Sequence, residues 1–339
     1  MPENTVAENT SHASSVPARI VIAGASGFIG AYLVDSFTRE GATVRTIGRR
    51  GADATWGDAA AIGALIDGVD VLINLAGKSV NCRYTPENRA EILRSRVDTT
   101  RQLREAVAAS AHPPALWVNS STATIYRHAE DRPMTESTGE LGTGFSVGIA
   151  TAWEAEFFAG ELGRTRRVAL RMAIVLGDGS ALLPLIRLAR FGLGGAQVDG
   201  RWPATAGRRA AGTFHEFRAR HGRQKFSWIH IADVAAIVRF LSDSPELAGI
   251  VNAAAPHPTE NRTMMRTLRR VLHVPIGIPS PRWVLEIGAA VIRTETELVL
   301  KSRWVIPERL TDAGYTFLYP HLKPALADII RHRAIRPRR

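Results

Sequence analysis

Short apolar runs alternate with longer amphipathic stretches over the first half of the chain. An apolar run bounded by turn residues is typical of a strand buried on both faces, and an amphipathic stretch at helical spacing is typical of a helix. Strands are predicted at 20–23, 43–47, 69–74, 116–120 and 168–171, and helices at 31–39, 89–109 and 149–162. This order predicts an α/β fold, a Rossmann-type doubly wound parallel sheet with crossover helices.

The alternation loosens after residue 175, where a smaller C-terminal α/β domain is predicted. Glycine and arginine dominate residues 192–225, which predicts a flexible insertion. We divide the chain into a disordered leader at 1–17, a doubly wound domain at 18–175, a partly interleaved domain at 176–330 with a basic insertion at about 196–224, and a basic tail at 331–339.

The run Gly24-Ala25-Ser26-Gly27-Phe28-Ile29-Gly30 lies between the first predicted strand and the first predicted helix. Glycine triplets in this context indicate a dinucleotide site. Gly24 permits the tight turn, Gly27 lets the backbone approach a pyrophosphate, and Gly30 lets helix and strand pack closely. The helix N-terminus then presents free N–H groups to the phosphates. The alternative is an ordinary glycine-rich turn.

The end of the second predicted strand indicates which dinucleotide binds. An acidic residue there would hold the ribose 2′-hydroxyl of NAD, whereas arginine accommodates the 2′-phosphate of NADP. The chain has Arg49 and Arg50 at this point, and its first carboxylate is Asp53. The sequence therefore favours NADP over NAD, unless both arginines are merely loop charges.

Composition narrows the class of protein. Hydrophobic residues make up 45% and charged residues 22% of the chain, which is ordinary for a soluble globular protein. No apolar run approaches the roughly 20 residues that span a bilayer, so no membrane partner is expected. Cys82 is the only cysteine, which excludes an intrachain disulfide and a thiolate zinc cluster and fits a reducing cytoplasm.

The formal charge of +11 invites a nucleic-acid partner. Lysine is rare, however, so the excess reflects an arginine-rich composition rather than a binding surface. The charge concentrates at 201–225 and 331–339, and no nucleic-acid-binding motif accompanies it. A nucleic-acid partner is therefore not expected.

Taken together, several motifs give the chain a specific likeness. It resembles the extended short-chain dehydrogenase/reductase superfamily and, within it, the YfcH-like epimerase-family proteins. The likeness extends from residue 18 to about residue 330, and the insertion at 196–224 departs from it. The motifs are Gly24 to Gly30, Asn74-Leu75-Ala76-Gly77, Ser95-Arg96-Val97-Asp98-Thr99-Thr100-Arg101, Trp153-Glu154 and Phe226-Ser227-Trp228-Ile229-His230.

The resemblance implies positions for a cofactor. Asp58 would approach the adenine, and the run Asn74 to Gly77 would line the cofactor. The strand that ends at Ser120 would deliver Ser121 and Thr122 toward the nicotinamide, where a hydroxyl can both donate and accept a hydrogen bond. The implied cofactor-binding residues are Gly24, Ser26, Gly27, Phe28, Ile29, Gly30, Arg49, Asp58, Asn74, Leu75, Ala76, Gly77, Ser120 and Ser121.

The superfamily's catalytic Tyr and Lys, four residues apart on one helix, have no counterpart here. The corresponding positions hold Ser146 and Ala150, and YfcH-like proteins generally lack the pair as well. Thr122 would orient the reacting oxygen, and Tyr126 or His128, on the loop after the same strand, would handle the proton.

A second polar cluster follows the earlier strand. Lys78, Arg83 and Tyr84 belong to this cluster, which could present cations to an anionic substrate. The alternative for both clusters is a solvated loop with capping roles. Glu154 is expected to be a packing partner rather than a base.

These features predict an NADP-dependent oxidoreductase or epimerase-like enzyme that acts on a small polar metabolite through a substrate-side domain at 176–330. The alternative is an NADP(H)-binding sensor or assembly factor without redox chemistry, suggested by the missing Tyr/Lys pair. Both a monomer and a homodimer are compatible with the sequence.

Overall fold

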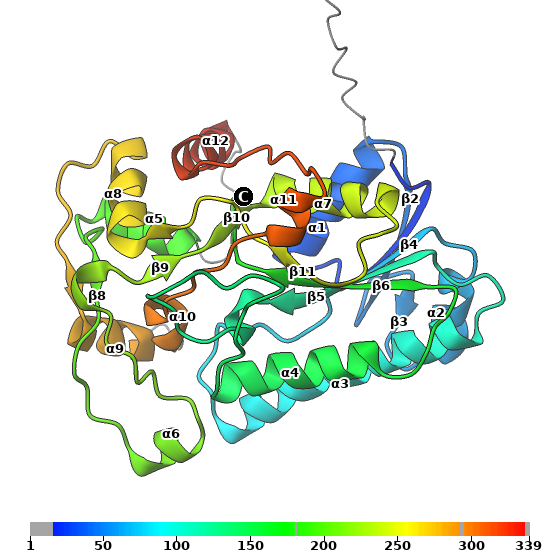
Figure 1. Cartoon of the computed structure of the whole chain (residues 1–339), viewed down its shortest axis with the longest axis horizontal. Coiled ribbons are helices and arrows are strands. Elements are labelled where there is room, and N and C mark those ends of the chain that lie inside the picture. Colours follow the sequence, from blue (N-terminus) through cyan, green and yellow to red (C-terminus); the bar gives the residue numbers. More distant parts are fainter. Residues whose placement is uncertain (1–15, 180–181, 292–294, 336–339) are drawn as a thin grey trace, which may run out of the picture.

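The computed structural model describes residues 16–179, 182–291 and 295–335. The molecule has a large lobe built on one sheet and a smaller lobe beside it (Figure 1). The predicted leader falls outside the described residues apart from Val16 and Pro17. The predicted tail does so from residue 336 onward, and residues 331–335 continue the last helix.

The large lobe is organised around a seven-stranded sheet in the order β11-β6-β5-β4-β1-β2-β3. Every neighbouring pair in it is parallel. The strands are β1 Arg19–Ala23, β2 Thr43–Gly48, β3 Ala54–Thr55, β4 Val71–Asn74, β5 Leu116–Thr122, β6 Arg166–Met172 and β11 Gly249–Ala253. The order reverses direction at β1, as in a doubly wound fold. The predicted fold class is confirmed.

Helices cover both faces of this sheet because its strands are apolar on both sides. In β1, Ile20 and Ile22 face the layer of α1 and α7, whereas Val21 and Ala23 face the layer of α2, α3 and α4. The helices are α1 Phe28–Arg39, α2 Ala59–Ile66, α3 Pro86–Ala109, α4 Phe145–Phe158 and α7 Ile231–Asp243.

Local signals set where the long helix α3 begins. The Oγ1 atom of Thr85 accepts a hydrogen bond from the backbone N–H of Asn88 at 3.3 Å, and Pro86 is the first helical residue. Threonine caps and a proline in the first turn are both favourable helix starts. The helix thus begins three residues before the predicted start at 89, because the cap and the proline precede the amphipathic pattern.

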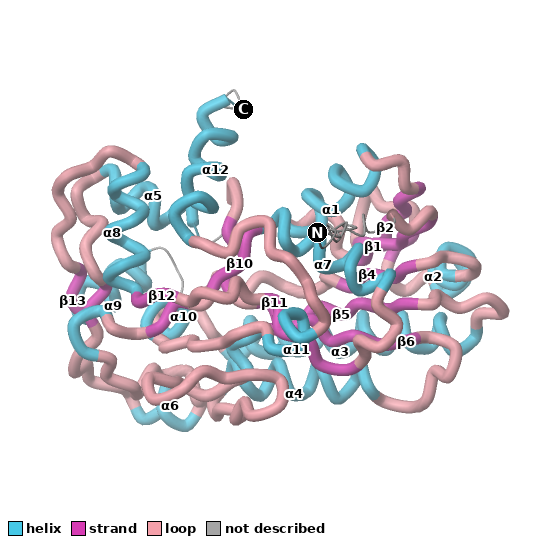
Figure 2. The backbone as a smooth tube through the Cα atoms, turned by 45° about the horizontal axis from the view of Figure 1, so that its top comes forward, coloured by secondary structure: helices cyan, strands magenta, loops and turns pink. Residues whose placement is uncertain are grey.

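The smaller lobe has its own core. The helices α5 Leu182–Arg190, α8 Asn261–Val271 and α12 Leu322–Ile335 pack around the buried Trp228. Figure 2 shows these helices grouped at the end of the molecule away from β2 and β3. The other elements are η1 Ala123–Ile125, β7 Ile174–Leu176, β8 Gln197–Val198, α6 Ala206–Ala210, η2 Arg220–Gly222, β9 Lys225–Phe226, β10 Trp228–His230, β12 Thr259–Glu260, β13 Ser280–Pro281, α9 Arg282–Val291, α10 Glu297–Leu300 and α11 Glu308–Asp312.

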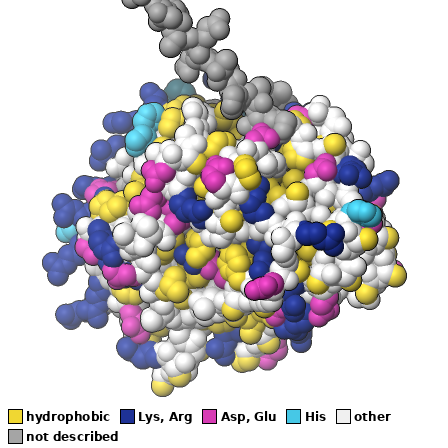
Figure 3. Space-filling model, turned by 45° about the vertical axis from the view of Figure 1, so that its right-hand side comes forward, with side chains coloured by type: hydrophobic (Ala, Val, Ile, Leu, Met, Phe, Trp, Pro, Cys, Tyr) yellow, Lys and Arg dark blue, Asp and Glu magenta, His cyan; other side chains and the backbone are white. Residues whose placement is uncertain are grey.

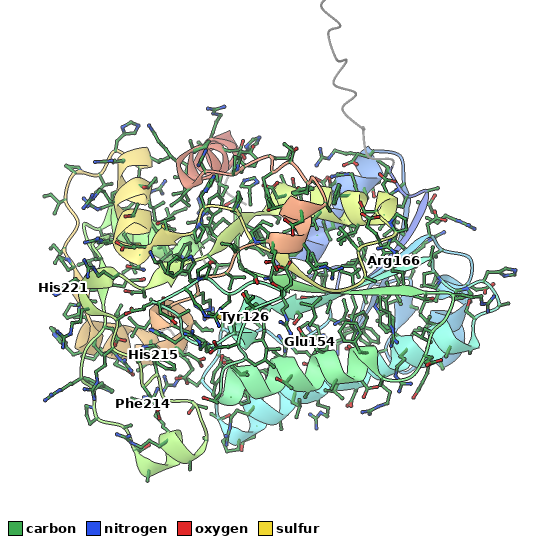
Figure 4. All side chains as sticks on the ribbon, viewed as in Figure 1. Tyr126, Glu154, Arg166, Phe214, His215 and His221 are labelled. Atoms are coloured by element: carbon green, nitrogen blue, oxygen red, sulfur yellow. The ribbon has the colours of Figure 1, made fainter. Side chains whose placement is uncertain are left out.

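The insertion at 196–224 is packed rather than free, which corrects the prediction of a flexible segment. Asp199 and His215 are buried, and their side chains lie 2.7 Å apart. Arg282 of α9 donates to Asp199 at 2.7 Å, so the insertion is tied to the smaller lobe by buried charge pairs. Figure 4 shows His215 and Phe214 in this part of the chain, away from Glu154.

The surface carries both signs of charge. On the face drawn in Figure 3, basic side chains are interspersed with acidic ones. No helix in the described part of the chain is long and apolar enough to cross a membrane.

Gly30 provides a test of the first turn. A Cβ atom at Gly30 would lie 2.5 Å from the carbonyl oxygen of Gly24 and 2.7 Å from the Cα of Ala25. We expect Gly30→Ala to lower the free energy of unfolding by about 1–3 kcal/mol, because backbone atoms must move to accept the methyl group. Urea unfolding measures this loss.

Gly63 in α2 is the matched control, since a Cβ there meets no atom within 4 Å. Gly63→Ala is expected to leave the free energy of unfolding unchanged or raise it by up to about 1 kcal/mol through helix propensity. Equal effects of the two substitutions would contradict the close packing at Gly30.

Candidate functional site

The turn after β1 brings three segments together at the carboxyl edge of the sheet. Gly24 has a positive φ of 82°, and a Cβ atom there would lie 2.7 Å from the carbonyl carbon of Leu75. Glycine therefore lets the turn lie directly on the end of β4. Gly27 precedes α1 without a side-chain cap, so N–H groups of the first helical turn are open to a ligand.

A groove of about 910 Å³ lies on one side of this turn. Its walls are Ala25, Ser26, the outer face of α1 and residues 46–52. Arg49 and Arg50 are exposed in it, and neither forms an ion pair within 4 Å with a described carboxylate. The groove can accept an anionic group beside Ser26.

Asp53, the first carboxylate after β2, is already engaged. It accepts hydrogen bonds from the backbone N–H and Oγ1 of Thr46, both at 2.8 Å, and from Arg45 at 2.9 Å. The Thr46 side chain and then its backbone N–H and Arg45 hold the pKa of Asp53 below its usual value, despite some burial. The carboxylate thus fixes the loop after β2 and is not presented to a ribose.

A smaller pocket of about 260 Å³ lies on the other side of the turn. Its walls are mainly apolar, and its polar groups are hydroxyls, one phenol and one guanidinium. The described lining residues are Ile29, Leu75, Ala76, Gly77, Val80, Tyr84, Ile92, Arg96, Ser120, Ser121, Thr122, Thr124, Phe145, Ser146, Ile149, Ala150, Trp153, Met172, Ala173, Val175 and Leu298.

The floor of the pocket rests on a buried ion pair. Ser121 donates to Glu154 at 2.5 Å, and Arg171 donates to both carboxylate oxygens of Glu154 at 2.8 and 2.7 Å. All three side chains are buried. Glu154 is therefore a structural partner that fixes the end of β5, in line with the expectation that it is not a base.

Thr122 ends β5 at the pocket wall. Its Oγ1 accepts the backbone N–H of Thr124 at 3.1 Å and caps the short helix η1. Two residues from the C-terminal part of the chain hold the turn after Thr122. Lys301 donates to the Thr124 carbonyl at 2.7 Å, and Arg303 donates to the Oγ1 atom of Thr124 at 3.1 Å. The Thr122 hydroxyl proton can still donate to a ligand oxygen.

Tyr84 forms the opposite wall. It is 8% exposed, its ring meets Phe145 edge-on at 4.8 Å, and its backbone N–H donates to Glu295 at 3.1 Å. Burial, followed by the nearby Glu297, raises the pKa of Tyr84, and a hydrogen bond with Ser146 acts in the other direction. The phenol is therefore neutral at physiological pH.

Arg96 brings a positive charge to the pocket. Its guanidinium lies 5.1 Å from the ring centre of Trp153 and donates to the carbonyls of Lys78 and Ile92, both at 3.0 Å. Burial lowers the pKa of Arg96 to about 10, and Tyr84 is the first of the groups that oppose this shift. The residue still carries its charge at neutral pH.

The structure gathers much of the predicted cofactor set around the glycine turn. Ser26 and Arg49 lie on the groove, whereas Ile29, Leu75, Ala76, Gly77, Ser120 and Ser121 lie on the pocket.

Three predicted cofactor residues form contacts within the chain. Asn74 is fully buried and bonds to Thr100, Asn119 and the N–H of Ala76. Asp58 caps α2 by accepting the N–H of Ala61 at 2.9 Å. Phe28 packs against the loop at Gly177, where a Cβ would lie 2.6 Å from its ring.

Tyr126 and His128 were predicted to handle the proton. Neither side chain lines the pocket, so the structure does not bring them to the site. Tyr126 is 1% exposed and donates to Asn252 at 2.9 Å, with the Arg171 guanidinium 4.9 Å from its ring centre. Figure 4 places Tyr126 inside the molecule near Glu154. His128 stacks on Phe217 and accepts the N–H of Ser302 at 3.1 Å.

Of the predicted substrate cluster, only Tyr84 lines the pocket among the described residues. Arg83 lies 3.5 Å from Glu295, and the backbone N–H of Lys78 donates to Ser95 at 2.9 Å. Sequence reasoning missed Arg96 as a site residue, although it lies in the motif Ser95 to Arg101. It also missed Phe145, whose ring contacts Tyr84, and Glu297, whose charge raises the pKa of Tyr84. These two residues are far apart in the chain.

The glycine turn, the groove with its arginines and the hydroxyl-lined pocket define a Rossmann-type nucleotide-binding protein of the extended short-chain dehydrogenase/reductase superfamily. The profile of the NAD dependent epimerase/dehydratase family matches residues 20–254, and a domain of unknown function, DUF1731, matches residues 280–329. The chain therefore belongs to the NAD dependent epimerase/dehydratase family.

Known relatives extend the likeness to nearly the whole chain. The bovine epimerase family protein SDR39U1 is 31% identical over 92% of this chain and 99% of its own length. The crystal structure of human SDR39U1 (isoform 2) with NADPH covers 92% of this chain and 99% of its own, with a TM-score of 0.78 and 28% identity. MoeE5 in complex with UDP-glucose and NAD shares the fold at a TM-score of 0.66 and 18% identity.

Tyr126→Phe tests whether the Tyr126 hydroxyl stabilises the interior and has no role at the pocket. The substitution removes the hydroxyl that bonds to Asn252 in the interior and leaves the pocket lining untouched. We expect the free energy of unfolding to fall by about 1–2 kcal/mol, because a buried acceptor loses its partner. NADPH affinity, measured by fluorescence titration, should be unchanged, and a selective loss of affinity would return Tyr126 to the site.

His128 makes stability depend on pH. Burial, followed by the charge of His215, lowers the pKa of His128 from 6.5 to about 4. Between these values the unfolded chain binds a proton that the folded chain does not, so stability is complete above pH 6.5 and falls toward pH 4. The loss is roughly 3–4 kcal/mol, at about 1.4 kcal/mol per pKa unit.

The non-titrating variant His128→Gln should have a shallower pH dependence in this window. Urea unfolding at a series of pH values compares the two slopes. Other buried groups, His230 among them, titrate in both proteins, so only the difference between the slopes reports on His128. Identical slopes would contradict a buried neutral His128.

Proposed function

We propose that this protein is an NADP(H)-dependent oxidoreductase that acts on a small carbonyl or hydroxyl compound, in the manner of an epimerase-family enzyme. One observation carries the proposal: an arginine-lined groove and a smaller pocket that contains hydroxyl groups both lie beside the glycine turn. A dinucleotide laid across such a turn puts its phosphates on the helix N-terminus and its two ends on opposite sides.

The residues of this chain fit NADP(H). Gly27 has no side chain at the uncapped start of α1, so the backbone there can approach a pyrophosphate. Arg49 or Arg50 would bind the 2′-phosphate, since a guanidinium fork matches a phosphate and Asp53 is turned toward Thr46. The NADPH in the human SDR39U1 structure supports this choice, whereas the NAD in MoeE5 belongs to a relative that shares only the fold.

The nicotinamide, when bound, exchanges a hydride with the substrate carbon. The chain's own residues orient the substrate and exclude water. Thr122 would donate a hydrogen bond to the reacting oxygen, and the apolar walls would keep solvent out of the pocket of about 260 Å³. A pocket of this size favours a small substrate over a sugar nucleotide. The cytoplasm is the proposed location, because the chain has a single cysteine.

Arg49→Ala tests the cofactor assignment. We expect the affinity for NADPH to fall about tenfold and the affinity for NADH to change less than twofold, because only NADPH carries the 2′-phosphate. Fluorescence titration measures both constants. Arg190→Ala, an exposed arginine of α5, is the control. Parallel losses for NADPH and NADH would contradict the role of Arg49.

A second function is a non-catalytic NADP(H)-binding protein, which the absence of the Tyr/Lys pair favours. Ser146 and Ala150 occupy those positions and line the pocket. Incubation of the protein with NADPH and the small carbonyl probe isatin distinguishes the two. Consumption of NADPH supports the oxidoreductase, whereas tight NADPH binding without turnover of isatin or of other small ketones and aldehydes supports the binding protein.

A further inference from the structure

A side chain from another segment shares the pocket with the positions of the missing catalytic pair. Ser146 and Ala150 have small side chains, and both face the pocket. Tyr84, from the loop between β4 and α3, lines the same pocket, and its ring meets the ring of Phe145, the residue before Ser146, at 4.8 Å. A phenol thus lies beside the residue at which the superfamily's helix would supply one.

Ser146 is in turn bonded to a carboxylate that does not line the pocket. Ser146 donates its hydroxyl proton to Oε2 of Glu297 at 3.0 Å. Glu297 is the first residue of α10, so the acceptor comes from the C-terminal domain. Its negative charge lies near two buried cations, Lys301 and Arg303, whose positive charges it helps to stabilise.

Arg96 adds a positive charge to this pocket. Among the described residues that line the pocket, Arg96 alone is charged, and its guanidinium lies 5.1 Å from the ring centre of Trp153. A positive charge beside a phenol stabilises the phenolate that forms while a proton passes through. Lysine has this role in the superfamily's pair, and Arg96 brings the same charge from α3.

We propose that Tyr84, Ser146 and Glu297 form the proton relay of this pocket, with Tyr84 as the catalytic residue that contacts the substrate oxygen and Arg96 as its positioning cation. The inference rests on the proposed oxidoreductase function and names the group that handles the proton. Neither the family match nor the relatives assign this role to any of these residues.

In the oxidation direction the proton moves outward. The substrate hydroxyl gives its proton to the Tyr84 oxygen, the Tyr84 hydroxyl gives its own to Ser146, and Ser146 gives its own to the Glu297 carboxylate. One O–H bond forms for each that breaks, and the substrate carbon gives its hydride to NADP⁺. In the reduction direction each transfer runs backward, and the alkoxide receives its proton from Tyr84.

The kinetic test uses the full-length protein with NADPH and isatin. Tyr84→Phe keeps the edge-on contact with Phe145 and removes only the hydroxyl. We expect kcat to fall about 100-fold or more, the usual range for loss of a general acid, while the KM for isatin and the affinity for NADPH change less than threefold. Ser146→Ala should lower kcat about tenfold. Tyr319→Phe, which removes a phenol outside the pocket lining, is the matched control and should be unchanged.

A second measurement is independent of turnover. The chain contains five tyrosines, so NMR of the protein labelled at the tyrosine Cζ resolves few signals, and Tyr84→Phe assigns the relevant one. The relay predicts that Ser146→Ala and Glu297→Gln each shift the Tyr84 signal at neutral pH, whereas Tyr319→Phe does not. A purely packing role for Tyr84 predicts no response to Ser146→Ala, which removes a hydroxyl and leaves every charge in place.

The outcomes separate the relay from the function on which it rests. Isatin reduction that survives Tyr84→Phe overturns the relay and leaves the oxidoreductase function standing. A Tyr84 signal that does not respond to Ser146→Ala and Glu297→Gln overturns the hydrogen-bonded chain. NADPH binding without turnover of isatin or of other small ketones and aldehydes contradicts the oxidoreductase function, and the catalytic use of the relay with it.

Discussion

The close approach of the first turn to the end of β4 is the constraint on which the site depends. At Gly24 the backbone lies so near Leu75 and Ala76 that a Cβ would be within 2.8 Å of three of their atoms. No other residue fits there without moving the strand ends apart. The contact places the turn directly on the end of β4, beside both the groove and the pocket.

The pocket is completed by parts of the chain that lie far from this turn. Arg208 of the insertion pairs with Glu295 at 3.2 Å, and Glu295 accepts the backbone N–H of Tyr84. The carbonyl of Gly212 accepts the N–H of Phe145 at 3.0 Å, so the insertion also holds the start of α4. Two walls of the pocket therefore depend on a segment that carries none of its lining residues, which gives the basic charge of the insertion a structural use.

Local sequence was sufficient for the sheet and for the glycine turn, because strand hydrophobicity and glycine geometry are properties of neighbouring residues. It was not sufficient for the direction of side chains. Asn74, Tyr126 and His128 have chemically suitable groups at strand ends, yet each is turned into the interior, where Thr100, Asn252 and Ser302 satisfy it. Those partners are between 26 and 174 residues away along the chain. A single sequence does not reveal contacts of such separation.

The missing Tyr/Lys pair is open to two opposite interpretations: the pocket has lost its chemistry, or other residues supply it. If the pocket had lost its chemistry, apolar side chains could fill the space at Ser146 and Ala150 without cost. Instead a phenol lines the pocket together with Ser146, and a guanidinium is kept there despite the burial that lowers its pKa to about 10. Burying polar groups in this way costs free energy unless they are paired. A site that keeps such groups facing a cavity, rather than replacing them with well-packed apolar residues, is organised for a polar ligand.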